Sequence, residues 1–136
     1  MVEMDVIYQG QLRTQITHGP SKAVLATDAP VDNMGRGEAF SPTDLLAASL
    51  ASCMLTTMGI VAQREQIELG EAKVRVGKEM TSSGPRRVQR LIVKFDLPKG
   101  FDDVQRRKLE HAAHACPVSK SLHPDVQVDV TFNWPD

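Results

Sequence analysis

The longest apolar segment of the chain runs from Ser41 to Gln66, and it predicts a long helix inside the protein. From Leu45 to Gln63 no residue is charged, whereas other segments carry charges every few positions. An N-cap, a proline suited to the first turn and a capping-box partner mark its start: Ser41, Pro42 and Asp44. Because apolar residues run all round this helix, we expect it to be covered on every side.

Most of the remaining chain alternates apolar and polar positions, which is typical of half-buried strands. Residues 5–29 predict an antiparallel meander, residues 71–80 and 86–98 a hairpin, and the segment from Asp125 a last strand. Asp102 is the expected N-cap of a second helix, and Pro117–Leu122 a short third one. The order βββ-α-ββ-α-α-β indicates an α+β fold with antiparallel sheets, in a single domain of residues 1–136.

The length of the chain bears on how the apolar helix is covered. A chain of 136 residues is one domain, and enclosing so long a helix would take a large share of its surface. We therefore expect a second subunit to help cover it. A transmembrane span is the alternative, since about 20 apolar residues cross a bilayer. Hydroxyl residues, alanines and Gly59 make the segment only mildly hydrophobic, which favours the core of a soluble protein and no membrane partner.

The distribution of charge and the first ten residues of the chain further limit the class of protein. The 16 basic and 17 acidic residues are interspersed, so there is no basic surface for nucleic acid or an anionic membrane. The start MVEMDVIYQG has neither the basic end nor the apolar run of a signal peptide, so we expect a cytoplasmic protein. In that compartment cysteines rest as thiols unless chemistry oxidises them.

The two cysteines, Cys53 and Cys116, are the strongest candidates for chemistry. Cys53 lies in the middle of the apolar helix, where a buried cysteine is more often a small core residue than a nucleophile. Pro117 breaks the second helix, so Cys116 falls near the start of the next one, where unpaired backbone donors favour a thiolate. If the two segments pack together, one thiol could attack a peroxide and the other could resolve the sulfenic acid into a disulfide.

Other candidate residues are fewer. His111, His114 and Cys116 form H-x-x-H-x-C, which does not match a structural zinc spacing, so we expect no metal and no other cofactor. Arg13 and Arg36 could hold a thiolate and polarise a peroxide oxygen, or be ordinary surface arginines. No phosphate loop, serine elbow or dinucleotide fingerprint is present.

The segments FSPTDLLAASLASCMLTTM (Phe40–Met58) and HACPVSKSL (His114–Leu122), with their cysteines about sixty residues apart, resemble the OsmC/Ohr family of peroxide-handling proteins. The resemblance covers nearly the whole chain. It implies an OsmC-like fold in an intertwined homodimer, with the central helix of each subunit at the interface.

The resemblance also implies a function. Cys53 would be the peroxidatic thiolate that reduces organic hydroperoxides, or hydrogen peroxide, and Cys116 the resolving thiol. An external dithiol reductant, such as a lipoylated protein, would recycle the disulfide.

One position departs from the family pattern. Family members carry a glutamate directly after the helix-opening proline, and it organises the reactive cysteine together with an arginine of the N-terminal strand region; here Thr43 takes that place. Arg13 lies in the matching strand region and Arg36 in the loop before the helix. An OsmC-like small-ligand-binding or stress protein, with the dimer-interface pocket but little peroxidase activity, is the alternative function.

Overall fold

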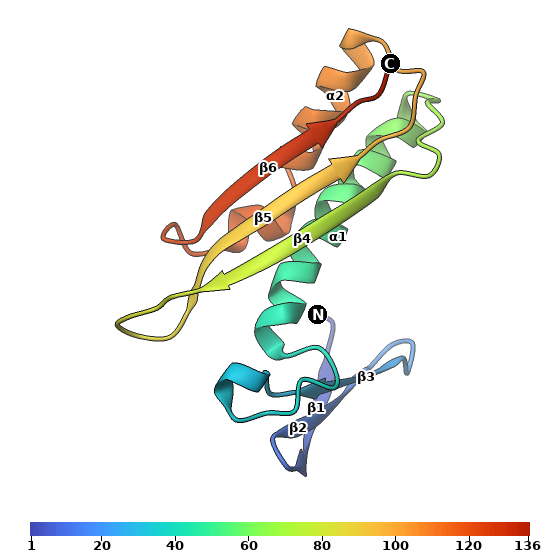
Figure 1. Ribbon diagram of the computed structural model, residues 1–136. Helices are drawn as coiled ribbons and strands as arrows, with labels where there is room; N and C mark the ends of the chain where they lie inside the picture. Colours follow the sequence, from blue (N-terminus) through green and yellow to red (C-terminus); the bar gives the residue numbers. More distant parts are fainter. The chain divides into compact units, whose positions relative to one another are not determined.

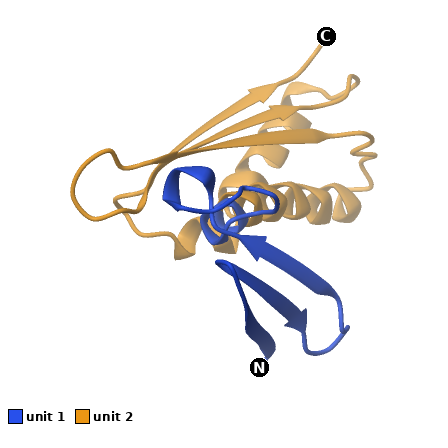
Figure 2. Ribbon diagram, turned by 60° about the horizontal axis from the view of Figure 1, so that its bottom comes forward, with its two compact units in different colours: residues 1–46 blue, residues 47–136 orange.

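The computed structural model describes all 136 residues, and they form two compact units (Figure 1). Residues 1–46 make up unit 1 and residues 47–136 make up unit 2, drawn in blue and orange in Figure 2. Each unit has its own three-stranded sheet. The fold has the α+β content predicted from the sequence.

Unit 1 is built on an antiparallel meander, which confirms the prediction for residues 5–29. Strands β1 (Met4–Gly10), β2 (Arg13–His18) and β3 (Val24–Asp28) pair in sequence order. The β2–β3 register places Arg13 directly opposite Asp28. This pairing therefore brings a cation and an anion from the two strands to the same end of the sheet.

The loop after β3 contains a short 3₁₀ helix, η1 (Val31–Asn33), and folds back tightly on the strand. The backbone N–H of Gly37 donates to the carbonyl of Ala29 at 3.2 Å, and that of Asp28 donates to the carbonyl of Phe40 at 3.1 Å. A Cβ at Gly35 would lie 1.7 Å from the Ala29 carbonyl oxygen. Only glycine fits there, so the path of this loop is closely defined.

Helix α1 (Pro42–Arg64) begins as its sequence predicts. The backbone N–H of Asp44 donates to Ser41 Oγ at 3.1 Å, and the N–H of Ser41 donates to Asp44 Oδ2 at 3.0 Å. This reciprocal pair is a capping box. After the helix Gln66 has a left-handed φ of 57°, and the N–H of Ile67 closes the last turn on the Ala62 carbonyl at 2.8 Å.

Within one chain, α1 is buried along one face only. The buried positions recur at helical spacing: Ala47, Leu50, Ala51, Met54, Met58 and Ala62. The opposite face is an exposed stripe without charge, formed by Leu46, Ser49, Ser52, Thr56, Ile60 and Gln63. The expectation that this helix is covered on every side is therefore not met by a single chain. By length and composition α1 could also cross a membrane, a property that core helices of soluble proteins share.

Unit 2 contains a mixed sheet with the strand order β4-β5-β6. Strands β4 (Lys73–Met80) and β5 (Val88–Asp96) form the predicted antiparallel hairpin. Strand β6 (Gln127–Asn133) pairs parallel to β5, so the prediction of wholly antiparallel sheets is wrong for this pair. The reason is the crossover through α2 and α3, which returns the chain to the same end of the sheet before β6 begins.

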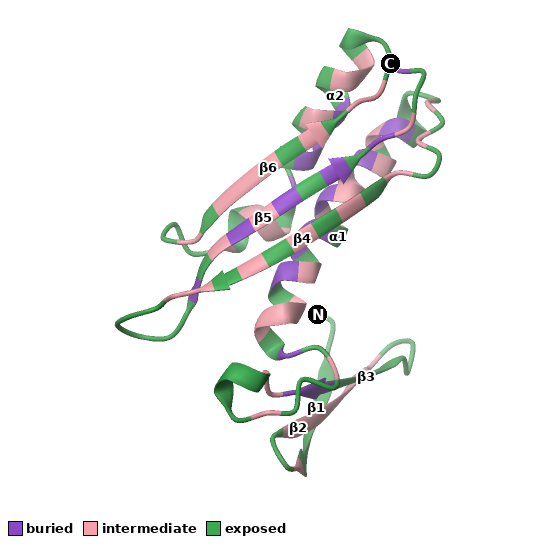
Figure 3. Cartoon of the chain, in the orientation of Figure 1, coloured by how far each residue is buried: buried purple, intermediate pink, exposed green.

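Helices α1 and α2 cover one face of this sheet (Figures 1 and 2). Helix α2 (Asp103–His114) opens with Asp102 in a capping box, as predicted, and α3 is Pro117–Ser121. The buried residues gather on β5 and on the facing side of α1 (Figure 3). Phe95 stacks on Phe132 with ring centroids 4.8 Å apart. The core thus lies between the sheet and the two helices.

Candidate functional site

Cys53 lies at the middle of α1 and is half-buried. Its side chain packs against the apolar core of unit 2, and its carbonyl accepts a hydrogen bond from Thr57 Oγ1 at 2.6 Å. The helix presents this thiol between its buried face and the exposed stripe. Cys53 is therefore supported by rigid secondary structure and still accessible from one side.

Cys116 occupies the N-cap of α3, as the sequence predicts. Pro117 is the first helical residue, and the backbone N–H of Ser119 donates to Cys116 Sγ at 3.2 Å. The residue is fully buried, with an exposed fraction of 0 %. It belongs to the same apolar core against which Cys53 packs.

The fold brings the two thiols near enough for Cys53 to act on the pKa of Cys116, and both are free thiols in this structure. Burial raises the pKa of the Cys116 thiol, and the neighbouring Cys53 raises it further. The N–H groups of Ser119 and Val118 act in the opposite direction without reversing the shift. The backbone donors at the helix start do favour the thiolate of Cys116, as expected, but the loss of solvent outweighs them, so the pKa is raised.

Arg13 is held by two carboxylates within unit 1. Its Nη2 lies 3.3 Å from Asp28 Oδ2 and 3.1 Å from Glu38 Oε2, and its side chain is 36 % exposed. Asp28 is almost fully buried, at 1 % exposed. The Glu38 side chain is 55 % exposed. One guanidinium nitrogen therefore bridges a buried and an exposed anion.

Asp28 is a residue that the sequence analysis missed. Its Oδ2 also accepts a hydrogen bond from the backbone N–H of Glu38 at 3.0 Å. This donor and the Arg13 guanidinium hold the pKa of Asp28 below its ordinary value, although burial opposes them. The available signal was an acid at the end of an apolar strand, opposite an arginine in the hairpin register.

The second candidate arginine is placed differently. Arg36 is 66 % exposed, and its Nη1 lies 3.9 Å from Glu38 Oε1. Thr43, which stands where the family pattern has glutamate, has its hydroxyl 3.3 Å from that of Ser41 at the helix start. The catalytic roles expected for Arg13 and Arg36 stay predictions, and only Arg13 is fixed by a buried partner.

The histidines do not form a metal site. No group of three His, Cys, Asp or Glu side chains is placed to hold a metal ion. His114 packs edge-on against Phe132, with ring centroids 5.7 Å apart. His114 is an exposed residue, so this contact holds its ring at the surface of unit 2.

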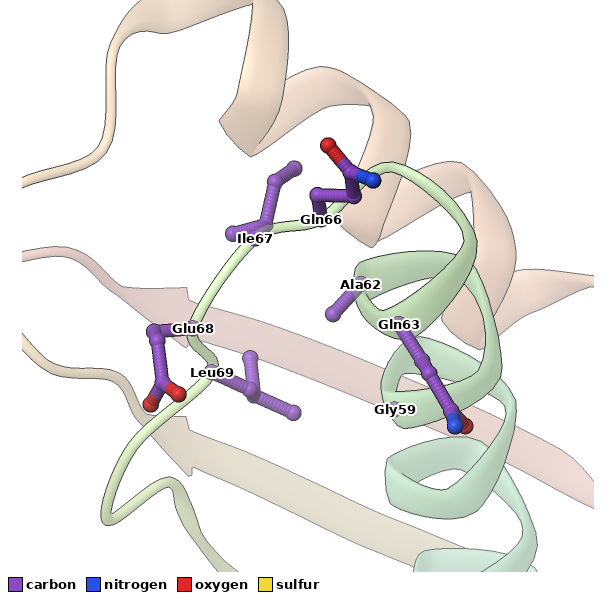
Figure 4. Close-up of a pocket in the computed structure, with 7 residues that line it drawn as sticks. All are labelled: Gly59, Ala62, Gln63, Gln66, Ile67, Glu68 and Leu69. Carbon is purple, nitrogen blue, oxygen red and sulfur yellow. The ribbon is translucent and has the colours of Figure 1, made fainter.

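A hollow of about 380 Å³ lies at the C-terminal end of α1 (Figure 4). The helix contributes Gly59, Ala62 and Gln63, and the following loop contributes Ile67 and Leu69 among others. Its one ionisable lining residue is Glu68, and neither cysteine reaches it. The hollow therefore lacks the groups that thiol chemistry needs.

Comparison with known proteins gives the following matches. A family model described as OsmC-like protein matches residues 35–131. No curated protein matches the chain. A crystal structure from Psychrobacter arcticus 273-4, provisionally named an osmotic stress induced and detoxification response protein, is 45 % identical with a TM-score of 0.91, covering 98 % of this chain and 96 % of that one.

Two more distant structures share the fold. The organic hydroperoxide resistance protein OsmC of Legionella pneumophila is 18 % identical, with a TM-score of 0.77 and coverage of 98 % of this chain and 96 % of that one. The organic hydroperoxide resistance protein OhrB of Bacillus subtilis is 22 % identical, with a TM-score of 0.69 and coverage of 98 % of both chains. At these identities the likeness establishes the fold alone.

Proposed function

The chain belongs to the OsmC-like protein family, and we propose that it is a thiol-dependent peroxidase that reduces organic hydroperoxides. One observation carries the proposal: the only two cysteines of the chain are neighbours with unequal access to solvent. A half-buried thiol can meet a substrate, and a buried thiol beside it can meet only the product of that reaction.

The proposed reaction has three steps. The Cys53 thiolate attacks the terminal oxygen of the hydroperoxide, the O–O bond breaks, and the peroxide proton leaves with the alcohol while Cys53 becomes a sulfenate. A proton from solvent converts the sulfenate to the sulfenic acid. Cys116 then attacks the Cys53 sulfur, which forms the disulfide and releases water. An external dithiol of the lipoyl type reduces the disulfide and is itself oxidised.

Burial of Cys116 supports this division of roles. A raised pKa keeps Cys116 protonated while Cys53 meets the peroxide. The Cys116 proton can leave with the hydroxyl of the sulfenic acid as water. The apolar surroundings of Cys53 favour an alkyl hydroperoxide over hydrogen peroxide.

We further propose a cytoplasmic homodimer. The exposed stripe on α1 carries no charge, and Val6, Ile7 and Tyr8 of β1 are each more than half exposed. A second copy of the chain would cover apolar surface that one chain leaves in water. A reducing compartment would return both cysteines to thiols between turnovers.

Steady-state consumption of cumene hydroperoxide with dihydrolipoamide tests the function. We expect turnover by the wild type and a loss of about a hundredfold or more in Cys53→Ser, because that variant lacks the nucleophile. Cys116→Ser should form a sulfenic acid that a dimedone reagent traps, without efficient recycling by the dithiol.

Negligible turnover of alkyl and hydrogen peroxides by the wild type would contradict the peroxidase. If Cys53 then also failed to react with dimedone after peroxide treatment, the alternative of a ligand-binding protein would stand in its place.

A further inference from the structure

The outer face of the β4-β5-β6 sheet in unit 2 is open, because helices α1 and α2 cover only the other face (Figure 1). The register across the three strands arranges the side chains of this face in rows. Two neighbouring rows consist of exposed polar residues: Arg75–Lys94–Thr131 and Lys73–Asp96–Asn133. These side chains therefore start from fixed positions on a sheet rather than from loops.

The first of these rows sets two cations side by side. Arg75 lies directly opposite Lys94 in the β4–β5 register, and like charges in this position destabilise a sheet. Neither side chain has an ion pair or a hydrogen-bond partner in this structure. The stability of the sheet therefore does not account for this pair of residues.

Charges further along the same face are balanced. Arg90 forms an ion pair with Asp129, and its Nη1 lies 3.7 Å from Glu79 Oε2. Asp129 also accepts a hydrogen bond from Gln127 Nε2 at 3.1 Å. The outer face is thus not a uniform surface of solvated charges, since one cluster is neutralised and the neighbouring row carries unpaired positive charge.

A hollow of about 330 Å³ lies beside the unpaired cations. Its polar lining consists of Arg75, Lys94, Asp96, Thr131 and Asn133. Asp96 is the acid among them, and its Oδ1 already accepts a hydrogen bond from Asn133 Nδ2 at 3.2 Å. The hollow therefore offers N–H and O–H donors, with an excess of positive charge.

These groups match the chemistry of a phosphate group. The planar guanidinium of Arg75 can donate to two oxygens of one anion, and the Lys94 ammonium adds a second positive charge. A phosphate monoester carries a charge of about −2 and three acceptor oxygens at neutral pH, so it can balance both cations and still accept from the Thr131 hydroxyl. A carboxylate has a single charge and leaves one cation unbalanced.

We propose that the outer face of the unit 2 sheet holds a binding site for a phosphate group, with Arg75 and Lys94 as the charged ligands and Thr131 as a neutral donor. Inorganic phosphate and a small phosphate monoester share this chemistry. The core that contains Cys116 lies on the opposite face of the sheet, so the site is independent of the proposed peroxidase.

An NMR titration of the full chain with inorganic phosphate tests the proposal. We expect the backbone amide signals of Arg75, Lys94 and Thr131 to shift and saturate, with a Kd on the order of 1 mM. Potassium chloride of equal ionic strength should not reproduce these shifts. Arg75→Gln and Lys94→Gln should each weaken binding about tenfold, because each removes one charged donor.

Lys73→Gln is the matched control. Lys73 is on the same strand and the same face, but the register sets it opposite Asp96 and it does not line the hollow. Its removal should change the Kd by less than about twofold. Without phosphate, Lys94→Gln should have a Tm no lower than that of the wild type, because the substitution removes a like-charge contact.

Glycerol 3-phosphate is the second probe. Tighter binding than inorganic phosphate would assign the site to a phosphate monoester, and equal or weaker binding would assign it to free phosphate. Four results would overturn the inference: shifts without saturation, shifts that chloride reproduces, an acetate affinity equal to that of phosphate, and an equal loss of affinity in Lys73→Gln and Lys94→Gln. The last would mean that the general positive field attracts the anion. Peroxide turnover does not enter any of these measurements, so the two proposals fail separately.

Discussion

The sheet of unit 1 and the sheet of unit 2 both have three strands, but different forces stabilise them. In unit 2, Leu91, Val93 and Phe95 of β5 are at most 1 % exposed and face two helices. In unit 1, the buried strand residues are Thr27 and Asp28, whereas β1 exposes large apolar side chains. Unit 2 is thus stabilised by apolar burial and unit 1 by a polar network, and unit 1 leaves the apolar side chains of β1 exposed.

The largest effect should come from the core of unit 2. Phe95→Ala removes a side chain that is 1 % exposed and stacked on Phe132, so we expect a loss of about 3–5 kcal/mol in the free energy of unfolding. Urea unfolding measures it. The matched control is Tyr8→Ala in β1, which is 64 % exposed and should cost less than about 1 kcal/mol. Equal losses would mean that unit 1 is covered in solution by another chain.

Acid should weaken unit 1 before unit 2. The pKa of Asp28 is lowered in the folded protein from an ordinary value of 3.8. Its contribution to stability is therefore complete above pH 3.8 and is lost as the pH falls through the lower, folded value. Hydrogen exchange below pH 3.8 should show earlier loss of protection in residues 13–40 than in β5.

Asp129 is the internal reference for that experiment. Its side-chain contacts with Gln127 and Arg90 also lower its pKa, but it lies on the outer face of a sheet that has an apolar core behind it. Simultaneous loss of protection in both sheets would argue against a special dependence of unit 1 on its polar network.

A polar substitution on β1 tests whether a second copy of the chain covers the sheet of unit 1. Val6 is 61 % exposed, so Val6→Ser should leave the unfolding of a single chain nearly unchanged. If a second copy covers β1, the substitution should weaken the dimer by about 1 kcal/mol, which is roughly fivefold in its dissociation constant. Sedimentation equilibrium measures this change. An unaltered constant would place the dimer contact elsewhere.

The smallest effect should come from a surface ion pair of unit 2. Lys108 Nζ lies 3.3 Å from Glu65 Oε2, and the two side chains are 49 % and 41 % exposed. Lys108→Ala should therefore change the free energy of unfolding by no more than about 0.5 kcal/mol. A thermal melt of Asp28→Asn beside it should show the larger fall in Tm, because only that pair includes a buried charge.

Features set by local chemistry could be predicted from the sequence. The capping boxes of α1 and α2 depend on side chains within three residues of Ser41 and Asp102, so their residue types suffice. The N-cap position of Cys116 follows equally from the proline beside it. The β4–β5 hairpin needs only alternation and a turn.

Features set by tertiary contacts could not be predicted in this way. Alternation in β6 shows which side chains share a face but not which strand is the neighbour, so its parallel pairing with β5 was missed. Asp28 was missed for a similar reason, because its burial and its contact with Arg13 depend on the register of a hairpin. The pKa of Cys116 depends on how completely the core excludes water, which its neighbours in sequence do not reveal.

The parallel pairing of β6 also has a consequence for the order of folding. The β4–β5 hairpin closes through a short turn, whereas β6 can dock only after residues 97–126 have been laid across the sheet. Contacts that close such long loops form late, because the chain loses conformational entropy on closing the loop before the docked strand gains its stabilising contacts. Cys116 lies within this crossover, so it reaches Cys53 only when unit 2 is nearly complete. Newly made chains should therefore acquire the thiol pair at the end of folding, and a nascent chain would hold two separated cysteines exposed to oxidants.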